Sequence, residues 1–224
     1  MQRLLLLIPT TTYRAKAFVT ATDKLTDVRL TMASEDASAL AALCPEYLIE
    51  INFHDRAQAC AQILAYHAKY PIDGVIGFDD TATLPAAWIA ETLNVKHHTV
   101  KSVTATRNKG DLRQMLHAAS VPQPAFQLIN IVSSPNDISL TIPFPCVIKP
   151  LSLSASKGVM RCNNIDELNT AYQTLIQILL HCENDDAEYL IESYVDGWEV
   201  AIEGIMTDGK LNILTIFDKP EPLT

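Results

Sequence analysis

The run Arg3-Leu4-Leu5-Leu6-Leu7-Ile8 decides the fold, because it is apolar at successive positions rather than at alternate ones. Such a run is typical of a strand buried on both faces, as in a parallel sheet that is covered by helices. Similar strand patterns and intervening helical patterns fill the rest of the first half. The predicted strands are 28–33, 47–51 and 74–78, and the predicted helices are 13–25, 35–43, 55–70 and 81–93. This alternation predicts a Rossmann-like α/β unit.

The pattern changes near residue 100, where strands begin to dominate. Helices are predicted at 108–119 and 165–181, and strands at 126–131, 146–149, 189–194, 200–206 and 211–217. The Thr207-Asp208-Gly209-Lys210 segment indicates a tight turn between the last two strands. The sequence therefore predicts two domains, residues 1–100 with a parallel sheet and residues 101–224 with α+β structure, and their boundary lies between Lys96 and Thr106.

Composition excludes several classes of protein. The chain has 224 residues, 48% hydrophobic and 19% charged, so it can bury a core and is not a disordered protein. Its 17 Lys and Arg residues stand against 26 Asp and Glu, and the net charge of −9 argues against nucleic acid or a membrane as partner. The five cysteines form no C-x-x-C pair, so neither a disulfide framework nor a zinc site is expected. Without a membrane-spanning or signal sequence, we expect a cytoplasmic protein.

Two polar turns in the first half have two interpretations each. Pro9-Thr10-Thr11-Thr12 and Asp79-Asp80 both follow a predicted strand, where ligands of open parallel sheets bind. Threonine and aspartate at these positions are also ordinary helix caps. At Asp79-Asp80 a substrate ammonium group or a metal is the alternative to a cap. No G-x-G-x-x-G motif follows the first strand, so dinucleotide binding by that motif is not expected.

The second half carries a lysine at the end of a buried strand, in Cys146-Val147-Ile148-Lys149-Pro150. Lysine is almost never fully buried without a partner, so we expect Lys149 to reach an anion or a carboxylate. The next segment, Leu151 to Val159, is rich in small hydroxyl residues and contains Lys157. Small residues let backbone N–H groups approach phosphate oxygens, although an ordinary surface loop would have the same composition.

A third feature is the apolar strand from Tyr189, which runs into a hinge and then into a further strand at Val200. Acidic residues stand at Glu192 and Glu199. Such a hinge can hold a flat base through backbone groups while a carboxylate binds ribose hydroxyls. A solvated strand face is the alternative explanation for part of this acidic pattern.

Three segments in this order resemble the ATP-grasp superfamily of carboxylate–amine ligases, and within it the amino-acid ligases. They are Thr104–Arg113 with the following Val121-Pro122-Gln123-Pro124, then Phe144–Pro150 with its loop, and then Tyr189–Glu203. The resemblance covers nearly the whole chain. It implies a pre-ATP-grasp domain at 1–100 followed by an incomplete ATP-grasp nucleotide-binding region at 101–224.

The resemblance also implies roles for individual residues. Lys109 would contact the phosphate side of the nucleotide, and Lys149 would bridge adenine and the α-phosphate. Ala155 and Ser156 would lie in the loop over the phosphates, with Lys157 nearby. Glu192 and Val195 would meet adenine through backbone groups, with Ser193 and Tyr194 between them, and Glu199 would bind the ribose. Two separated lysines and a small-residue loop fit a polyanion, and an apolar hinge fits a purine.

The implied reaction uses ATP and Mg²⁺ to activate a small-molecule carboxylate as an acyl phosphate, which an amine then attacks. Amino acids are candidate substrates, and the oligomeric state is open, a homodimer included.

Two departures from the family pattern stand out. The loop from Ser152 to Gly158 has one glycine, where many members have several. The metal-binding acids and the catalytic arginine of the family are expected beyond residue 224, so no catalytic or metal-ligating residue is assigned, and this chain alone is expected to be inactive. A non-catalytic nucleotide-sensing module is the alternative.

Overall fold

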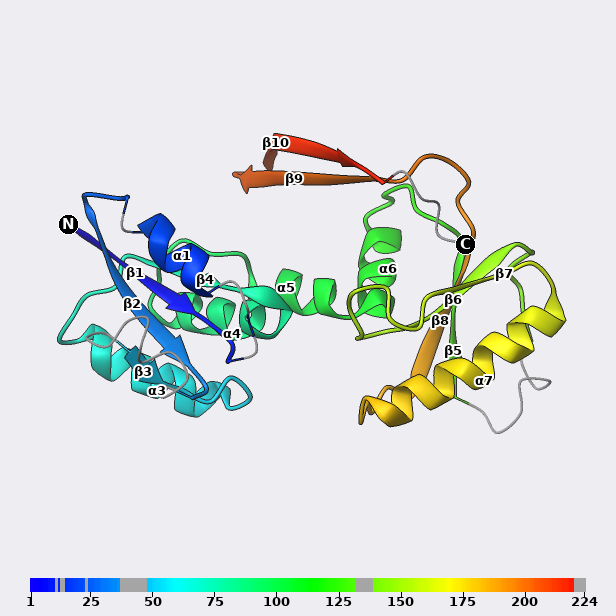
Figure 1. The fold of residues 1–224 in the computed structure, drawn as a ribbon, viewed down its shortest axis with the longest axis horizontal. Coiled ribbons are helices and arrows are strands. Elements are labelled where there is room, and N and C mark those ends of the chain that lie inside the picture. Colours follow the sequence, from blue (N-terminus) through cyan, green and yellow to red (C-terminus); the bar gives the residue numbers. More distant parts are fainter. Residues whose placement is uncertain (11, 13–14, 23, 37–47, 132–138, 220–224) are drawn as a thin grey trace. The chain divides into compact units, whose positions relative to one another are not determined.

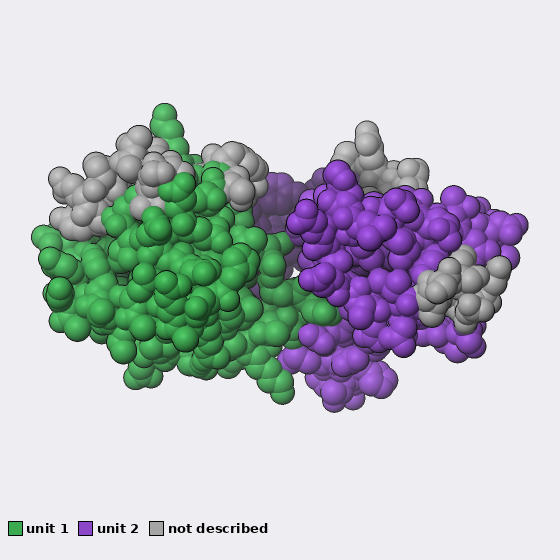
Figure 2. All heavy atoms as spheres, turned by 90° about the horizontal axis from the view of Figure 1, so that it is seen from below, with its two compact units in different colours: residues 1–108 green, residues 109–224 purple. Residues whose placement is uncertain are grey.

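The structure is a computed structural model that describes residues 1–10, 12, 15–22, 24–36, 48–131 and 139–219. The chain divides into two compact units, residues 1–108 and 109–224, which Figure 2 colours separately. The sequence placed the end of the first domain at residue 100. Helix α5 (Val100–Arg107) packs against α4 (Asp79–Thr92), so the first unit extends to the end of α5.

Unit 1 is built on a parallel four-stranded sheet in the order β3-β2-β1-β4 (Figure 1). Its strands are β1 (Gln2–Leu7), β2 (Val28–Ser34), β3 (Leu48–Glu50) and β4 (Gly74–Gly77), and its other helices are α1 (Ala15–Thr22) and α3 (Arg56–His67). The predicted Rossmann-like fold class of this half is confirmed. Most of the helix predicted at 35–43 falls on residues 37–47, which lie outside the described residues.

Both faces of this sheet are covered, which explains the continuous apolar run in β1. Leu5 and Leu7 belong to a core cluster with residues of α3 and α4. Leu6 and Ile8 belong to a second cluster with Ala15 at the start of α1. Because successive side chains of a strand point to opposite faces, a strand between two helical layers must be apolar at every position.

Unit 2 contains an antiparallel four-stranded sheet in the order β5-β8-β6-β7. These strands are β5 (Phe126–Asn130), β6 (Cys146–Pro150), β7 (Met160–Cys162) and β8 (Glu188–Ser193), and the helices are α6 (Lys109–Ala118) and α7 (Ile165–His181). Strands β9 (Val200–Thr207) and β10 (Lys210–Asp218) form a separate antiparallel hairpin through the turn that the sequence predicted. The α+β class of this half is confirmed as well.

Alternation along β6 and β8 sorts their side chains between the two faces of this sheet. Cys146, Ile148 and Ile191 lie in the core cluster that α7 covers. Lys149 and Glu192 are out of phase with them and therefore lie on the opposite face. In the register of the two strands Lys149 stands opposite Leu190, two positions from Glu192, which makes the charged residues diagonal neighbours. The fold thus places two of the predicted site residues together on one sheet face.

Within the described ranges, no helix is long and apolar enough to cross a membrane.

Candidate functional site

Lys149 does reach a carboxylate, that of Glu192. The Lys149 Nζ forms an ion pair and a hydrogen bond with Glu192 Oε1, and both side chains are largely buried, 15% and 9% exposed. Glu192 needs such a partner, because an unpaired carboxylate is costly to bury. The pairing was expected from the position of Lys149, but the sequence did not identify Glu192 as its partner.

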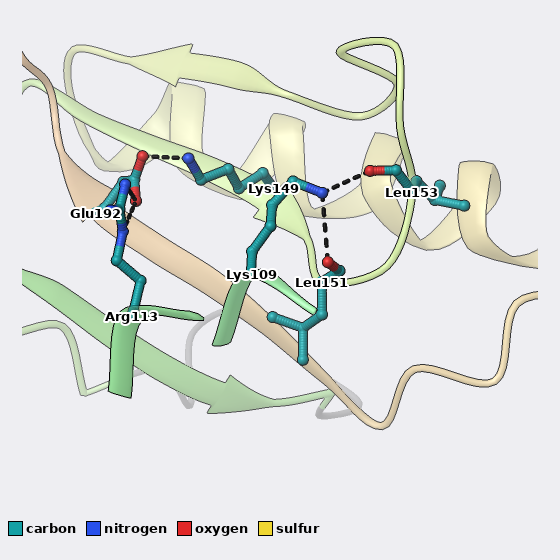
Figure 3. A network of polar contacts seen from close by, with 6 residues as sticks. All are labelled: Lys109, Arg113, Lys149, Leu151, Leu153 and Glu192. Carbon is teal, nitrogen blue, oxygen red and sulfur yellow. Dashed lines mark hydrogen bonds and ion pairs between the residues drawn. The ribbon is translucent and has the colours of Figure 1, made fainter. Parts of the chain in front are cut away.

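A third charged residue, Arg113 on α6, completes this cluster (Figure 3). Its Nε and Nη2 both lie 2.9 Å from Glu192 Oε2, and its side chain is 19% exposed. Two cations therefore share one carboxylate at a part-buried site. Arg113 lies in the Thr104–Arg113 segment that carries the family resemblance, but the sequence did not identify it as a site residue. Its spacing from Lys109 was the available signal, because residues four apart lie on the same face of a helix.

Lys109 lies at the first residue of α6 and holds the beginning of the loop that follows β6. Its backbone N–H donates to the Leu151 carbonyl at 3.0 Å. Its Nζ donates to the carbonyls of Leu151 and Leu153 at 3.3 and 2.5 Å, as Figure 3 shows. The ammonium group is thus next to the loop that the sequence predicted for phosphate binding.

That loop has an unusual backbone conformation. Ala155 and Ser156 have positive φ values of 55° and 57°, and Gly158 closes the loop with φ 74°. A side chain at Gly158 would be strained by this φ and would also meet the Pro150 ring at 3.1 Å. Positive φ at non-glycine residues is uncommon and tends to occur at ligand-binding segments. Ala155, Ser156 and Lys157 are exposed, so this part of the loop is accessible to a ligand.

The loop also has an anchor that the sequence did not indicate. Asp186, between α7 and β8, accepts hydrogen bonds through Oδ2 from Leu151 N, Ser152 N and Ser152 Oγ at 3.2, 3.1 and 3.0 Å. Asn184 donates to the same Ser152 Oγ at 2.8 Å. The first residues of the loop are therefore fixed from both sides, by Lys109 and by Asp186.

The predicted hinge follows β8 and is tied to the sheet by its backbone. Ser193 N donates to Ala125 O at 2.8 Å, and Tyr194 N donates to Pro145 O at 3.1 Å. The Arg161 guanidinium lies over the Tyr194 ring, 4.1 Å from its centroid. Val195 comes next and is 68% exposed. The hinge is thus held at Ser193 and Tyr194 and exposed at Val195.

Glu199 does not join the charged cluster of Glu192. It pairs with Lys219, which follows β10, through Nζ and Oε1, and both side chains are substantially exposed. The structure therefore brings together Lys109, Lys149 and Glu192 with the loop. It places Glu199 in a separate ion pair at the base of the hairpin.

Two titratable groups beneath the cluster, Tyr189 and Cys162, are not available for acid–base work. Burial raises the pKa of Tyr189, whose side chain packs beside that of Tyr172. A side-chain hydrogen bond with Cys146, together with burial, raises the pKa of Cys162 on the neighbouring strand. Both groups stay neutral at physiological pH and belong to the core under the sheet.

The Asp79-Asp80 turn of unit 1 lies at the start of a helix. Asp79 and Asp80 form the first turn of α4 rather than its cap, which is Phe78 without a side-chain hydrogen bond. Carboxylates in a first turn favour the helix through its dipole, and Asp80 also pairs with Arg107 at 3.6 Å. In the part of the chain that the structure describes, no three His, Cys, Asp or Glu side chains gather as a metal site would require.

Comparison with known proteins identifies the family. Residues 26–95 match the ATP-grasp N-terminal domain, and residues 142–223 match the ATP-grasp domain. The chain belongs to the ATP-grasp superfamily. Loop 151–158, Lys149 and Glu192 all lie within the segment that matches the ATP-grasp domain, whereas Lys109 and Arg113 lie before it.

Two sequence relatives are similar to this ATP-grasp chain. The protein y4rH of Sinorhizobium fredii is 27% identical over 216 residues, which cover 95% of this chain and 44% of that protein. The ATP-grasp enzyme fsqD of Aspergillus fumigatus is 25% identical over 149 residues, which cover 66% of this chain and 24% of that protein. The chain thus spans less than half the length of these relatives.

Solved structures show the same fold. The L-amino acid ligase from Bacillus licheniformis superposes with a TM-score of 0.71 at 20% identity, over 100% of this chain and 52% of that one. The ADP complex of N5-carboxyaminoimidazole synthetase from Staphylococcus aureus superposes with a TM-score of 0.69 at 11% identity, over 96% and 54%. At these identities the likeness establishes the fold alone.

Proposed function

We propose that this chain supplies the nucleotide-binding part of an ATP-dependent carboxylate–amine ligase that joins small molecules, amino acids among them. The observation that carries the proposal is the cluster of Lys109, Lys149 and Glu192 beside loop 151–158, within a fold of the ATP-grasp superfamily. Support for amino acids as substrates comes from the likeness to the L-amino acid ligase.

The chemistry of the site suits a nucleoside polyphosphate. Arg113 balances the single carboxylate of Glu192, so the Lys149 ammonium group is an excess positive charge in partly buried surroundings. Such a site favours an anion, because the local dielectric is low and an uncompensated charge is costly there. The exposed loop beyond Ser154 adds backbone N–H groups and the Lys157 ammonium.

Each part of the site has a distinct role in this proposal. Lys149 turns from Glu192 toward the α-phosphate, and loop 151–158 covers the outer phosphates. The backbone of the hinge from Glu192 to Val195 receives the adenine, and Glu199 exchanges Lys219 for the ribose hydroxyls. Bound ATP supplies the phosphoryl group that activates the carboxylate. The residues described here do not fit a magnesium site, so no step is assigned to the metal.

Calorimetric titration with ADP tests the nucleotide site on the protein as its gene encodes it. We expect binding, and we expect Lys149→Met to weaken it about 10- to 100-fold, the effect of losing a charge-assisted hydrogen bond. Lys101→Met removes an exposed lysine of α5 and serves as the matched control. Failure of the unsubstituted protein to bind ADP, or equal affinities for the two variants, contradicts the proposal.

Release of ADP from ATP in the presence of pooled amino acids and other carboxylates and amines tests the ligase reaction. A pool that stimulates release identifies the substrate class. Binding of ADP without stimulated release by any pool supports the nucleotide-sensing alternative instead.

A further inference from the structure

Glu192 divides its two oxygens between two cations from different elements. Oε2 accepts from Arg113 Nε and Nη2, both at 2.9 Å, and Oε1 contacts Lys149 Nζ. Figure 3 shows Lys149 and Arg113 contacting different oxygens of the carboxylate. The two partners therefore do not compete for one oxygen, and either contact can break while the other stays.

This division matters because the Lys149 ammonium group has two possible partners, Glu192 and a phosphate group. In the structure the ammonium group neutralises Glu192, whereas the nucleotide site proposed above requires it to face phosphate. If Glu192 had no other partner, moving Lys149 would leave a carboxylate that is 9% exposed without a counter-charge. Leaving a buried charge unpaired costs more than an ordinary hydrogen bond is worth. Lys149 would then be held in place, and an anion would bind weakly.

Arg113 removes this difficulty by its geometry. A guanidinium presents several N–H groups in a fixed plane, stays charged at any physiological pH and is well suited to buried ion pairs. The backbone carbonyl of Arg113 accepts from Gln123 Nε2 at 2.9 Å, which fixes this turn of α6 against the segment that follows the helix. Lys109, four residues earlier on α6, binds the carbonyls of Leu151 and Leu153 at the beginning of loop 151–158. Helix α6 thus connects the loop and the carboxylate.

We infer that Arg113 is a positioning residue of the proposed nucleotide site: it keeps Glu192 neutralised so that Lys149 can turn to the phosphates. The inference rests on the proposed function, since it requires a phosphate ligand for Lys149. Arg113 itself contacts no part of the nucleotide in this account. Its effect passes entirely through the charge of Glu192.

A double-substitution cycle separates this role from a purely structural one. In Arg113→Met the carboxylate depends on Lys149 alone, and we expect the Kd for ADP to rise about tenfold, as for a buried carboxylate left unpaired. In Glu192→Gln no charge needs neutralising, so adding Arg113→Met to it should change the Kd by less than about twofold. Arg113→Lys keeps the charge and should recover part of the affinity that Arg113→Met loses.

Arg107→Met breaks the ion pair with Asp80 outside the site and should leave the Kd unchanged. If Arg113→Met binds ADP as well as the unsubstituted protein, or weakens binding equally in the Glu192→Gln background, the inference is wrong while the proposed function stands. If the unsubstituted protein does not bind ADP, both fall. Should Arg113→Met alone fail to fold by circular dichroism, Arg113→Lys takes its place in both backgrounds, and an equal change of the Kd in the two backgrounds contradicts the inference.

Discussion

Asp186 is the residue that fixes where the loop after β6 begins. Its Oδ2 receives two backbone N–H groups and one hydroxyl from Leu151 and Ser152. Leu153 and Ser154 separate these residues from the exposed, positive-φ positions Ala155 and Ser156. A loop that is strained in its middle can keep one conformation only if its ends are held, and Asp186 supplies that restraint at the first end.

We predict that Asp186→Asn weakens ADP binding about three- to tenfold, since a neutral amide oxygen is a poorer acceptor than a carboxylate and its NH₂ group opposes the donors. Asp185→Asn removes the neighbouring exposed carboxylate and is the matched control. Calorimetry with ADP gives both affinities. Equal affinities for the two variants would show that the Asp186 contacts are not needed to hold the first residues of the loop.

Among single residues, the sequence predicted those whose chemistry is unusual for their surroundings. Lys149 could be selected because lysine seldom ends a buried strand, and its partner is indeed a carboxylate. Arg113 and Asp186 could not be selected in the same way. Both are ordinary surface types in ordinary positions, and only the packing of α6 on β8 and the path of the α7–β8 connection bring them to the site.

Helix α7 begins with a network of side-chain caps that extends toward the hinge. Asn164 Oδ1 accepts from Glu167 N at 2.9 Å, and Glu167 Oε2 accepts from Asn163 N and Nδ2, both at 2.8 Å. Asn163 Oδ1 in turn accepts from Arg161 Nε at 3.1 Å. Arg161 is the residue that lies over Tyr194. The start of α7 therefore orients a cation against the predicted adenine hinge.

This network gives a pH-dependent prediction. The pKa of the Glu167 carboxyl is lowered, chiefly because it accepts from the Asn163 backbone and side chain. A lowered folded-state pKa means that the carboxylate stabilises the fold above its unfolded pKa of about 4.3 and loses this effect as pH falls through the folded value. Glu167→Gln should therefore lower the melting temperature at pH 7, and the difference from the unsubstituted protein should shrink as the pH falls from about 4.3 through the lower folded-state pKa.

Thermal unfolding followed by circular dichroism over this pH range tests the prediction. Glu203→Gln, on the exposed β9 strand, is the control and should show no such pH dependence. A destabilisation by Glu167→Gln that is the same at both ends of the range would assign the effect to the lost cap geometry rather than to charge.

Among the elements, those with a clear apolar pattern were predictable, short strands such as β5 and β6 included. Helix α7 has the predicted bounds, because its apolar positions repeat with helical spacing and Asn164 precedes it. Helix α5 was missed, because half of its residues are β-branched and lower its helix propensity: Val100, Val103, Thr104 and Thr106. Its Thr99 cap and its packing against α4 provide the missing stability, and packing is not visible in a single sequence.

For the whole molecule, the important property is that each unit has its own core. The clusters around Leu5 and Leu7 and around Leu6 and Ile8 contain only residues of unit 1. The cluster around Leu175 and Tyr189 contains only residues of unit 2. All residues of the proposed nucleotide site, from Lys109 to Glu199, belong to unit 2. Nucleotide affinity should therefore depend on the stability of one core and not of the other.

A pair of matched cavity substitutions tests this division, one fully buried leucine in each unit. Leu7→Ala and Leu175→Ala should each destabilise the unit that contains it by about 2–5 kcal/mol, through lost transfer energy and the cavity that remains.

Hydrogen exchange measured on peptides from each unit will show which part opens more readily. We expect Leu7→Ala to increase exchange in unit 1 and to change the Kd for ADP by less than about twofold, because the core cluster of Leu7 contains no residue of the nucleotide site. Leu175→Ala should increase exchange in unit 2 and weaken ADP binding, since it loosens α7 beneath the sheet that carries Lys149 and Glu192. Equal losses of ADP affinity in the two variants would mean that unit 1 contributes to the nucleotide site as directly as unit 2.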